Sequence, residues 1–330
     1  MAQTLADIAA EAGTSISTVS RVLAGGAVAR RISEPTRRRV TDAAARLGYR
    51  PNLIARSLRT RRSNTVALLV SDIANPWFGR LASLVEQALH DAGYSLILCN
   101  SGEDAAREAE YLRLLPQKNI DGLVLVPVVR TSEALRDHLP QDFPLVLVDR
   151  PIPGVCGCVA SDQHELATLL CDALAARGVR RICLVGGPAD VVTHSRRGEV
   201  VSSRFEVIGR HEGPAQRETG VAAWAAFTAD GSAAAADAVV CTNNFLGQGV
   251  LDAAAATAGP PVKCLGLFDE LPMMSLLPIP IAAALQDVPA LAQACVAQLL
   301  PRLRGDAAPP NPTPPRPQLV TNRAFDDSVG

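Results

Sequence analysis

The sequence lacks the features that would place it in a membrane or outside the cell. No stretch of its 330 residues approaches the roughly 20 uninterrupted apolar residues that cross a bilayer. The opening residues, MAQTLADIAAEAG, contain two acids but neither a basic segment nor a continuous apolar run, so no signal peptide is expected. We therefore expect a cytoplasmic protein that does not contact a membrane.

Recognisable catalytic and metal-binding motifs are missing as well. The patterns GxxxxGK[ST], GxSxG and HExxH do not occur, and the five histidines lie apart from one another. The eight cysteines are scattered through apolar contexts, and Cys156-Gly-Cys158 is too closely spaced for an ordinary zinc site. We expect no enzymatic activity, no cofactor and no metal.

The composition is that of a packed globular protein, with 48% apolar and 20% charged residues, and the length suggests two or three folding units. The net charge of −1 conceals an asymmetry. Residues 1–62 contain twelve arginines and four acids, a charge of +8, which leaves −9 for the other 268 residues. A basic N-terminal module joined to an acidic body indicates a polyanionic partner for the module.

The basic module has the pattern of a helix-turn-helix. Residues 5–12 carry apolar side chains at helical spacing, with Thr4 as N-cap, Asp7 three residues later and Gly13 as terminator. A second helix follows the N-cap Ser15, and its outer face carries four side chains that could enter the major groove: Ile16, Ser17, Ser20 and Arg21. A third helix is expected at residues 34–47. A helix-turn-helix that contacts protein is the alternative, but it would leave the +8 charge without a purpose.

After residue 62, apolar strands alternate with helices, which is typical of parallel, doubly wound sheets. Strands are expected at 65–70, 95–99, 122–127, 145–148, 181–185, 238–241 and 263–267. Helices are expected at 77–92, 105–116, 163–177 and 247–258. Ligands of such sheets bind at the carboxyl ends of the strands.

Several segments resemble the lactose-repressor (LacI/GalR) family of transcription regulators: TLADIAAEAGTSISTVSRVL, RISEPTRRRV, ARLGYRPNLIARSLRTRRSNTVALLV and DIANPWF. The resemblance implies an all-α helix-turn-helix headpiece followed by an α/β periplasmic-binding-protein-like body of two doubly wound lobes. The implied headpiece spans residues 1–60, with a hinge helix at 53–59, and the effector-binding body spans 61–330. Lobe one would comprise about 63–160 and 288–318, and lobe two about 161–286 with the C-terminal strand.

The resemblance also implies which residues contact double-stranded operator DNA. The expected set is Thr4, Ser15, Ile16, Ser17, Thr18, Ser20, Arg21, Arg31, Asn52, Ala55 and Leu58. Leu58 matches the leucine that wedges into the minor groove at the operator centre, although it could instead pack the headpiece onto the body. Ala55, one turn earlier, is small enough for paired hinge helices to approach closely.

The implied effector contacts are Ser71, Asp72, Trp77, Asp149, Arg197, Asn243, Asp269 and Gln286. Acids, amides and an arginine form a polar set that can surround a polyhydroxylated ligand. Alternatives remain for several members: strand-end capping for any of them, a place in the lobe core for Trp77, and Arg196 in place of Arg197 as the inward-pointing arginine.

The connection LAGGAVARRISEPTRRRV and the segments LVDRPIPGVCGCVASDQHE and VVCTNNFLGQGVLDA resemble the fructose-repressor branch of the family. That branch implies a sugar-phosphate effector such as fructose 1-phosphate. Residues 301–317 form a proline-rich linker, and no heptad tail follows it, so a homodimer on a pseudo-palindromic operator is expected. A different sugar, or a corepressor, is the alternative effector, and a sugar-binding protein without a DNA role is the remote one.

The wedge assignment can be tested with Leu58→Ala. We expect this variant to bend operator DNA less and to bind it more weakly, because an apolar side chain is needed to unstack the central base step. Bending is measured by energy transfer between dyes on the two ends of the duplex. Unchanged bending would show that Leu58 is not the wedge.

Overall fold

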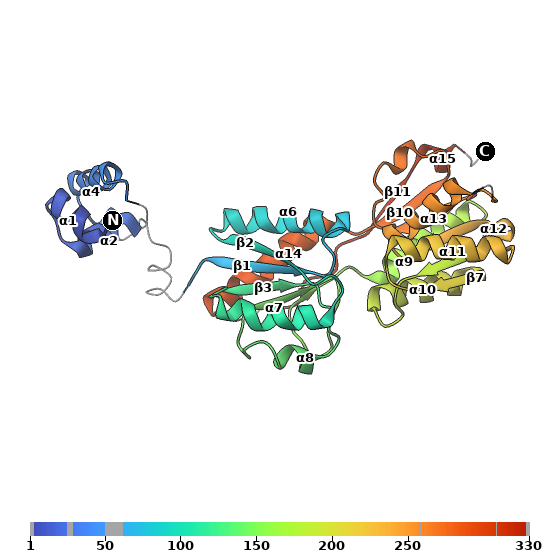
Figure 1. The fold of residues 1–330 in the computed structure, drawn as a ribbon, viewed down its shortest axis with the longest axis horizontal. Coiled ribbons are helices and arrows are strands. Elements are labelled where there is room, and N and C mark those ends of the chain that lie inside the picture. The colour runs from blue at the N-terminus through green and yellow to red at the C-terminus, as the bar shows by residue number, and fades with distance from the viewer. Residues whose placement is uncertain (1–2, 25–28, 50–61, 258, 308, 328–330) are drawn as a thin grey trace. The chain divides into compact units, whose positions relative to one another are not determined.

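A computed structural model describes residues 3–24, 29–49, 62–257, 259–307 and 309–327 (Figure 1). The chain divides into two units, residues 1–63 and 64–330, which we call the headpiece and the body. The predicted hinge helix at 53–59 lies outside the described residues. No described helix is long and apolar enough to cross a membrane.

The headpiece contains helices α1 (Leu5–Ala12), α2 (Ile16–Ala24) and α4 (Glu34–Arg46). At the start of α1, Thr4 and Asp7 form the expected capping box: the Asp7 amide donates to Thr4 Oγ1 over 3.4 Å, and the Thr4 amide donates to Asp7 Oδ2 over 2.8 Å. Gly13 ends α1 in the left-handed conformation, with φ of +60°. The turn that joins α1 to α2 therefore forms as the sequence predicts.

A small apolar core holds the three helices together. Ile8 of α1, Val19 of α2 and Val40 of α4 are completely buried, and alanines at the crossing points let the helices approach closely. On the surface, Arg46 Nε of α4 donates to Glu11 Oε1 of α1 over 2.9 Å. The apolar face of α2 is thus turned toward α1 and α4, which leaves its other face outward.

Lobe one of the body is built on a five-stranded parallel sheet in the order β2-β1-β3-β4-β5. Its strands are β1 (Thr65–Val70), β2 (Ser95–Asn100), β3 (Gly122–Leu125), β4 (Leu145–Val148) and β5 (Cys158–Val159). Helices α6 (Pro76–Asp91) and α14 (Val288–Arg304) cover one face, and α7 (Ala105–Gln117) and α8 (Ser132–Arg136) cover the other (Figure 1).

Lobe two is built on a six-stranded sheet in the order β11-β10-β9-β8-β6-β7, parallel except for β11. Its strands are β6 (Arg181–Gly186), β7 (Glu206–Glu212), β8 (Ala238–Cys241), β9 (Leu265–Phe268), β10 (Ile281–Leu285) and β11 (Gln318–Thr321). Helices α9 (Gln163–Ala176), α10 (Val192–Arg204) and α15 (Arg323–Asp326) lie on one face. Helices α11 (Arg217–Ala229), α12 (Ser232–Ala235) and α13 (Asn244–Ala256) lie on the other, and η1 (Met274–Leu276) follows β9.

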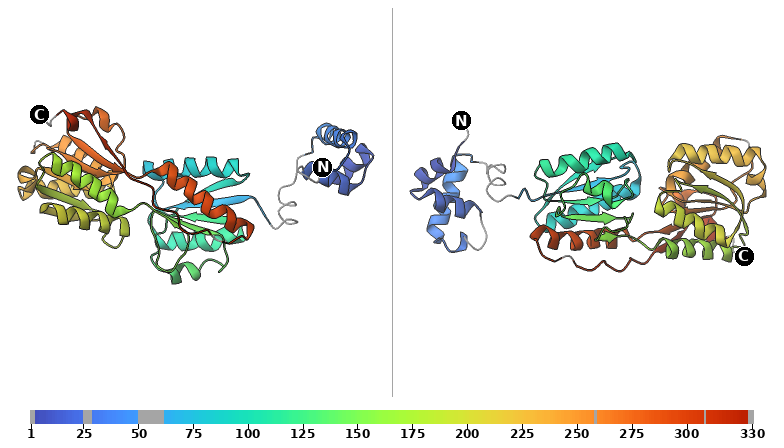
Figure 2. Two further views of the ribbon diagram at one scale, coloured as in Figure 1. Left: turned by 180° about the vertical axis from the view of Figure 1, so that it is seen from behind. Right: turned by 90° about the horizontal axis from the view of Figure 1, so that it is seen from below.

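The chain passes between the lobes three times: from β5 to α9, from β10 to α14, and from α14 to β11 (Figure 2). The last passage is the proline-rich segment, which is anchored to lobe one along its path. Asn311 Oδ1 accepts from the Gly157 amide over 3.1 Å, and Gln298 Nε2 donates to Pro310 O over 2.6 Å. Three segments of chain thus join the two lobes, and polar residues at the strand ends of both lobes face one cleft.

Both lobes contain elements that the sequence pattern did not predict, such as α14 in lobe one and β10 in lobe two. The sequence pattern gave no strand at 206–212 and no helix at 217–229, where the structure has β7 and α11. β7 is the outermost strand of its sheet, and no residue in it is fully buried, so it lacks the apolar run of a central strand. Helix α13 starts at Asn244, three residues earlier than expected, because Asn243 caps it.

Candidate DNA-binding surface and effector cleft

The outer face of α2 carries the side chains that the sequence assigns to DNA. Ile16 is 53% exposed, Ser17 and Arg21 are exposed, and Ser20 is half-buried. Arg21 makes no ion pair or hydrogen bond with the residues that the structure describes. A free guanidinium beside small hydroxyl side chains can reach into a major groove and pair with guanine.

Other predicted DNA contacts have local structural roles. Ser15 Oγ accepts from the Thr18 amide over 3.1 Å and therefore caps α2, and it also lies 2.8 Å from Thr18 Oγ1. Thr4 caps α1. Arg31 is exposed, whereas Asn52, Ala55 and Leu58 lie outside the described residues.

In the body, a cleft of about 560 Å³ lies between the lobes at the carboxyl ends of the strands. Its volume is in the range of small-molecule sites. Its lining includes seven of the eight predicted effector contacts: Asp72, Trp77, Asp149, Arg197, Asn243, Asp269 and Gln286. The eighth, Ser71, is completely buried and does not line the cleft.

Asp149 and Asp269 occupy corresponding positions in the two lobes. Asp149 directly follows β4, Asp269 directly follows β9, and each has a left-handed backbone with φ of +68°. Non-glycine residues in this conformation concentrate at functional sites. Burial raises the pKa of Asp269, and the Asp149 charge raises it further, while Arg197 opposes the shift. Both carboxylates therefore favour a ligand that can donate hydrogen bonds.

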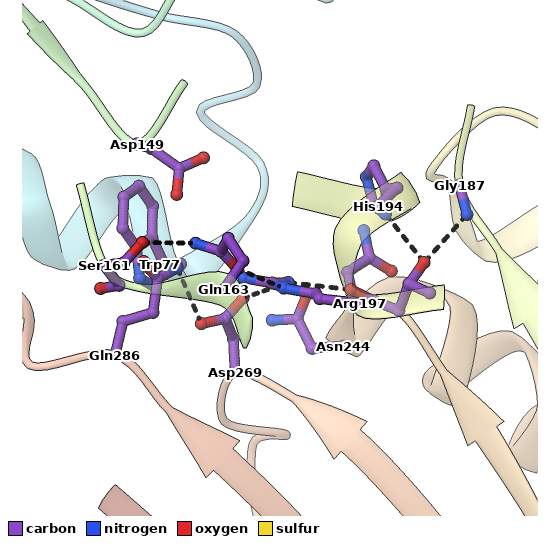
Figure 3. A network of polar contacts seen from close by, with 12 residues as sticks. Trp77, Asp149, Ser161, Gln163, Gly187, His194, Arg197, Asn244, Asp269 and Gln286 are labelled. Carbon is purple, nitrogen blue, oxygen red and sulfur yellow. Dashed lines mark hydrogen bonds and ion pairs between the residues drawn. The ribbon is translucent and has the colours of Figure 1, made fainter. Parts of the chain in front are cut away.

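Arg197 is the centre of the polar network in lobe two (Figure 3). Its Nε donates to Gln163 Oε1 over 2.8 Å, and its Nη1 donates to Thr242 O over 2.9 Å and lies 3.5 Å from Asp269 Oδ2. Gln286 Nε2 donates to Asp269 Oδ1 over 3.3 Å. Arg197 is only 3% exposed, whereas the Arg196 side chain is 63% exposed and pairs with Glu199. Arg197 is thus the inward-pointing arginine.

Lobe one contributes a second buried guanidinium. Arg150 binds Glu103 through both ends of its fork, with Nη1 to Oε2 at 2.9 Å and Nη2 to Oε1 at 2.6 Å. Burial acts to raise the pKa of Glu103, but Arg150 outweighs it and the net pKa is lowered. Arg150 Nε is buried without a hydrogen-bond partner and lies 3.9 Å from Asp149 Oδ2. One donor of this guanidinium thus remains unused.

His194 lies on α10, one turn before Arg197, and is 7% exposed. Its Nδ1 is 2.8 Å from Thr242 Oγ1, which also accepts from the Gly187 amide over 2.9 Å (Figure 3). A Cβ on Gly187 would lie 2.5 Å from the imidazole ring, so only glycine fits there. Burial lowers the pKa of His194 well below its ordinary value, and Arg197, Arg150 and Arg130 lower it further. The imidazole is therefore neutral at pH 7.

Direct contacts join the lobes beside the cleft. Asn75, the N-cap of α6, and Asn244, the first residue of α13, exchange hydrogen bonds through their side-chain amides at 3.2 and 3.3 Å. Both are buried. Arg130 of lobe one pairs with Asp190 of lobe two at 3.0 Å. Polar side chains from the two lobes thus meet beside the cleft.

Several cleft residues were not predicted, notably Glu103, Arg130 and His194. Glu103 and Arg130 follow β2 and β3, so the rule that ligands bind at strand ends would have found them. Trp77 lines the cleft and also packs in the core of lobe one, so its position agrees with both predicted roles, effector contact and core residue. Asn243 lines the cleft while its Oδ1 caps α13 by accepting from the Leu246 amide.

Two family models match this chain. Residues 4–52 match the bacterial regulatory proteins of the lacI family, and residues 63–258 match the periplasmic binding proteins and sugar binding domain of the LacI family. The chain belongs to the LacI family.

Relatives of this LacI-family chain are transcriptional regulators. The regulator PtxS of Pseudomonas putida is 32% identical over 312 residues, which cover 92% of this chain and 90% of PtxS. The regulator RegA of Clostridium saccharobutylicum is 37% identical over 196 residues, which cover 58% of this chain and 57% of RegA. The protein is therefore a DNA-binding transcriptional regulator, and the prediction that it is not an enzyme is confirmed.

Solved structures of the family share its fold. The lac repressor dimer bound to operator and the anti-inducer ONPF has a TM-score of 0.84 at 21% identity, covering 98% of this chain and 99% of that one. The Cra dual regulator of Pseudomonas putida in complex with fructose 1-phosphate has a TM-score of 0.71 at 22% identity, covering 78% and 98%. These matches confirm the predicted fold class of a helix-turn-helix headpiece and a two-lobed α/β body.

The exposed face of α2 leads to a prediction for Arg21→Ala. If Arg21 makes one bidentate contact to guanine, the variant loses about 1–3 kcal/mol of operator binding and discriminates less between bases at that position. Fluorescence anisotropy with operator and random duplexes measures both effects. Equal losses on the two duplexes would instead assign Arg21 to a phosphate contact.

Proposed function

We propose that this protein is a repressor of sugar metabolism, released from a pseudo-palindromic operator when a sugar phosphate such as fructose 1-phosphate binds between the lobes. The effector class follows the resemblance to the fructose-repressor branch. The lobe arrangement, with acids, amides and guanidinium groups at the strand ends of one cleft, supports a ligand rich in hydroxyl groups.

The observation that carries the proposal is the set of buried polar atoms without partners on cleft residues. Asp149 Oδ1 and Gln286 Oε1 lack a donor, and Trp77 Nε1 and Arg150 Nε lack an acceptor. An unsatisfied buried polar group costs about 1–3 kcal/mol. A sugar hydroxyl both donates and accepts, so one polyhydroxylated ligand can satisfy acceptors and donors together.

Release requires that the effector bind one arrangement of the lobes more tightly than another. Asp149 and Arg150 belong to lobe one, whereas Arg197, Asp269 and Asn243 belong to lobe two. A ligand that bonds to both groups adds to the contacts that already join the lobes, Asn75–Asn244 and Arg130–Asp190. The resulting shift of lobe one would reach the DNA through residues 53–59, which connect the body to the headpiece.

Operator release tests this function directly. A palindromic duplex selected from a random library is labelled, and its anisotropy with the full-length protein is followed during titration with fructose 1-phosphate, fructose 1,6-bisphosphate and fructose. Release by a phosphorylated sugar only is the expected result. Release by fructose alone would favour an unphosphorylated sugar, and tighter operator binding would make the ligand a corepressor.

The two neighbouring arginines of α10 provide a matched pair of variants. Arg197→Ala should abolish the response to effector and leave operator affinity unchanged, because a buried guanidinium that faces the cleft is lost. Arg196→Ala should respond normally, because that side chain points to solvent. For Arg197→Ala we expect effector binding to weaken by about 2–5 kcal/mol, the usual cost of losing one partner of a buried charge pair.

Arg197 also supports Gln163 and Asp269, so thermal melting of the variant must show that lobe two still folds. Asp149→Asn is a second variant that disturbs the fold less, since asparagine tolerates the left-handed backbone, and Arg150, 3.9 Å from Asp149, keeps both hydrogen bonds to Glu103. If either folded variant releases operator at the same effector concentration as the parent, the assignment of the cleft is wrong.

We also propose that the repressor is a homodimer. Strand β2 is an edge of the lobe-one sheet, and it exposes Ile97 (44%) and Leu98 (41%). An uncovered apolar edge strand invites pairing with other chains, and native proteins usually cover it. A second copy on this edge would bury both side chains and match the two-fold symmetry of a palindromic operator.

Sedimentation equilibrium should therefore give the mass of two chains for the parent and of one chain for Leu98→Arg. The charged side chain cannot be buried against its own symmetry mate without a large desolvation cost. The variant should also bind operator more weakly, since two linked headpieces bind more tightly than one. A four-chain mass for the parent would overturn the dimer, and a two-chain variant would move the interface away from β2.

A further inference from the structure

His194 has one ring nitrogen engaged and one free. Nδ1 is held by Thr242 Oγ1 at 2.8 Å, and Nε2 has no hydrogen-bond partner among the described residues. The ring is held in place by the Gly187 backbone beside it and by the turn of α10 that also carries Arg197. A buried, fixed imidazole with an unused nitrogen on the wall of a ligand cleft is available to a ligand.

The charges that act most strongly on this imidazole inside the cleft are positive. Arg197 is on the same helix, and Arg150 and Arg130 reach the cleft from lobe one. Each has an acidic partner: Asp269 for Arg197, Glu103 for Arg150 and Asp190 for Arg130. The pair of Arg130 with Asp190 is exposed, and such pairs contribute little. Arg150 Nε has no hydrogen-bond partner, although it lies 3.9 Å from Asp149 Oδ2.

The remaining charges around His194 are paired among themselves. His194 also lines a second groove, together with Glu199, Arg210 and Glu212, among others. Arg196 pairs with Glu199 at 3.0 Å, and Arg210 pairs with Glu212 at 3.0 Å. Two further carboxylates line the cleft, Asp72 and Asp149, and Asp149 Oδ2 lies 3.9 Å from Arg150 Nε. We call the part of the cleft formed by His194, Arg130 and Arg150 the His194 corner.

We propose that an anionic group of the effector binds at the His194 corner and that His194 takes up a proton as it binds. This inference rests on the proposed function and adds to it the position of the anionic group and a coupling to pH. An anion offers acceptors to His194 Nε2, to Arg150 Nε and to Arg130, and its charge offsets the three guanidinium groups that disfavour imidazolium.

The sign of the coupling follows from the change in protonation. The free protein holds His194 neutral at pH 7, and an adjacent anion raises the pKa of the imidazole, so the complex binds more protons than the free protein. Affinity for an anionic effector therefore rises as the pH falls. The limit is about tenfold per pH unit, for uptake of one whole proton. A neutral sugar gains nothing from the same change.

Inorganic sulfate is a suitable probe because its charge is constant between pH 5 and 8, unlike that of a phosphate ester, whose second pKa is about 6. In the full-length protein carrying ¹³C at histidine Cε1, we expect the His194 resonance to stay that of neutral imidazole from pH 8 to 5.5 in chloride. In sulfate at equal ionic strength, we expect the pKa of His194 to rise, so that its resonance titrates between pH 8 and 5.5. The resonance is assigned by its loss in His194→Gln.

His90 provides the internal control, since it lies on the last turn of α6 and is exposed. A sulfate-induced shift at His194 without one at His90 supports the proposal. Equal shifts at both would show general electrostatic screening and overturn it, as would the absence of any shift at His194.

Calorimetry then tests the coupling with a sugar. Binding of a sugar sulfate such as glucose 6-sulfate is measured at pH 7 in two buffers of different ionisation enthalpy, which gives the number of protons taken up. The parent should take up a substantial fraction of a proton, and His194→Gln, whose amide replaces the Nε2 donor but cannot be protonated, should take up none. Equal uptake by both proteins, or no binding, would overturn the proposal. Operator release is measured in a separate experiment on the parent protein, so either result leaves the test of the repressor function intact.

Discussion

The cleft depends on keeping charged groups ionised where water is largely excluded. Arg150 and Arg197 are almost completely buried, and carboxylate or carbonyl oxygens accept hydrogen bonds from both guanidinium groups. The acids that do this, Glu103 and Asp269, are themselves cleft residues. The same side chains thus hold the lobes' strand ends in place and present polar atoms to a ligand. A substitution at any one of them alters both the position of the strand ends and the polar atoms presented to a ligand.

Much of the fold could be predicted from local patterns in the sequence. Thr4, Asp7 and Gly13 mark the ends of α1, and apolar runs such as 65–70 and 145–148 mark central parallel strands. The rule that ligands bind at strand ends led to Asp149 and Asp269 in the same way. Ser71 is buried and does not line the cleft, because β1 is buried on both faces and nothing in its periodicity shows where the buried run stops.

Other parts of the site depend on contacts between distant residues. Glu103 and Arg150 are 47 residues apart, and Asn75 and Asn244 are 169 residues apart, so no local pattern relates them. His194 was an isolated histidine in the sequence, and it gained its significance only when α10 placed it one turn from Arg197 and beside Thr242. These residues are brought together by tertiary packing, so no motif with a fixed spacing could have predicted them.

The reciprocal amide pair of Asn75 and Asn244 has a consequence for how the lobes respond to their surroundings. The two side-chain amides exchange one hydrogen bond in each direction, and neither carries a net charge, so this junction is indifferent to ionic strength and to acidity over the physiological range. The Arg130–Asp190 junction is partly exposed and ionic, and mobile counterions weaken it. One of these contacts between the lobes therefore weakens as the salt concentration rises, while the other does not.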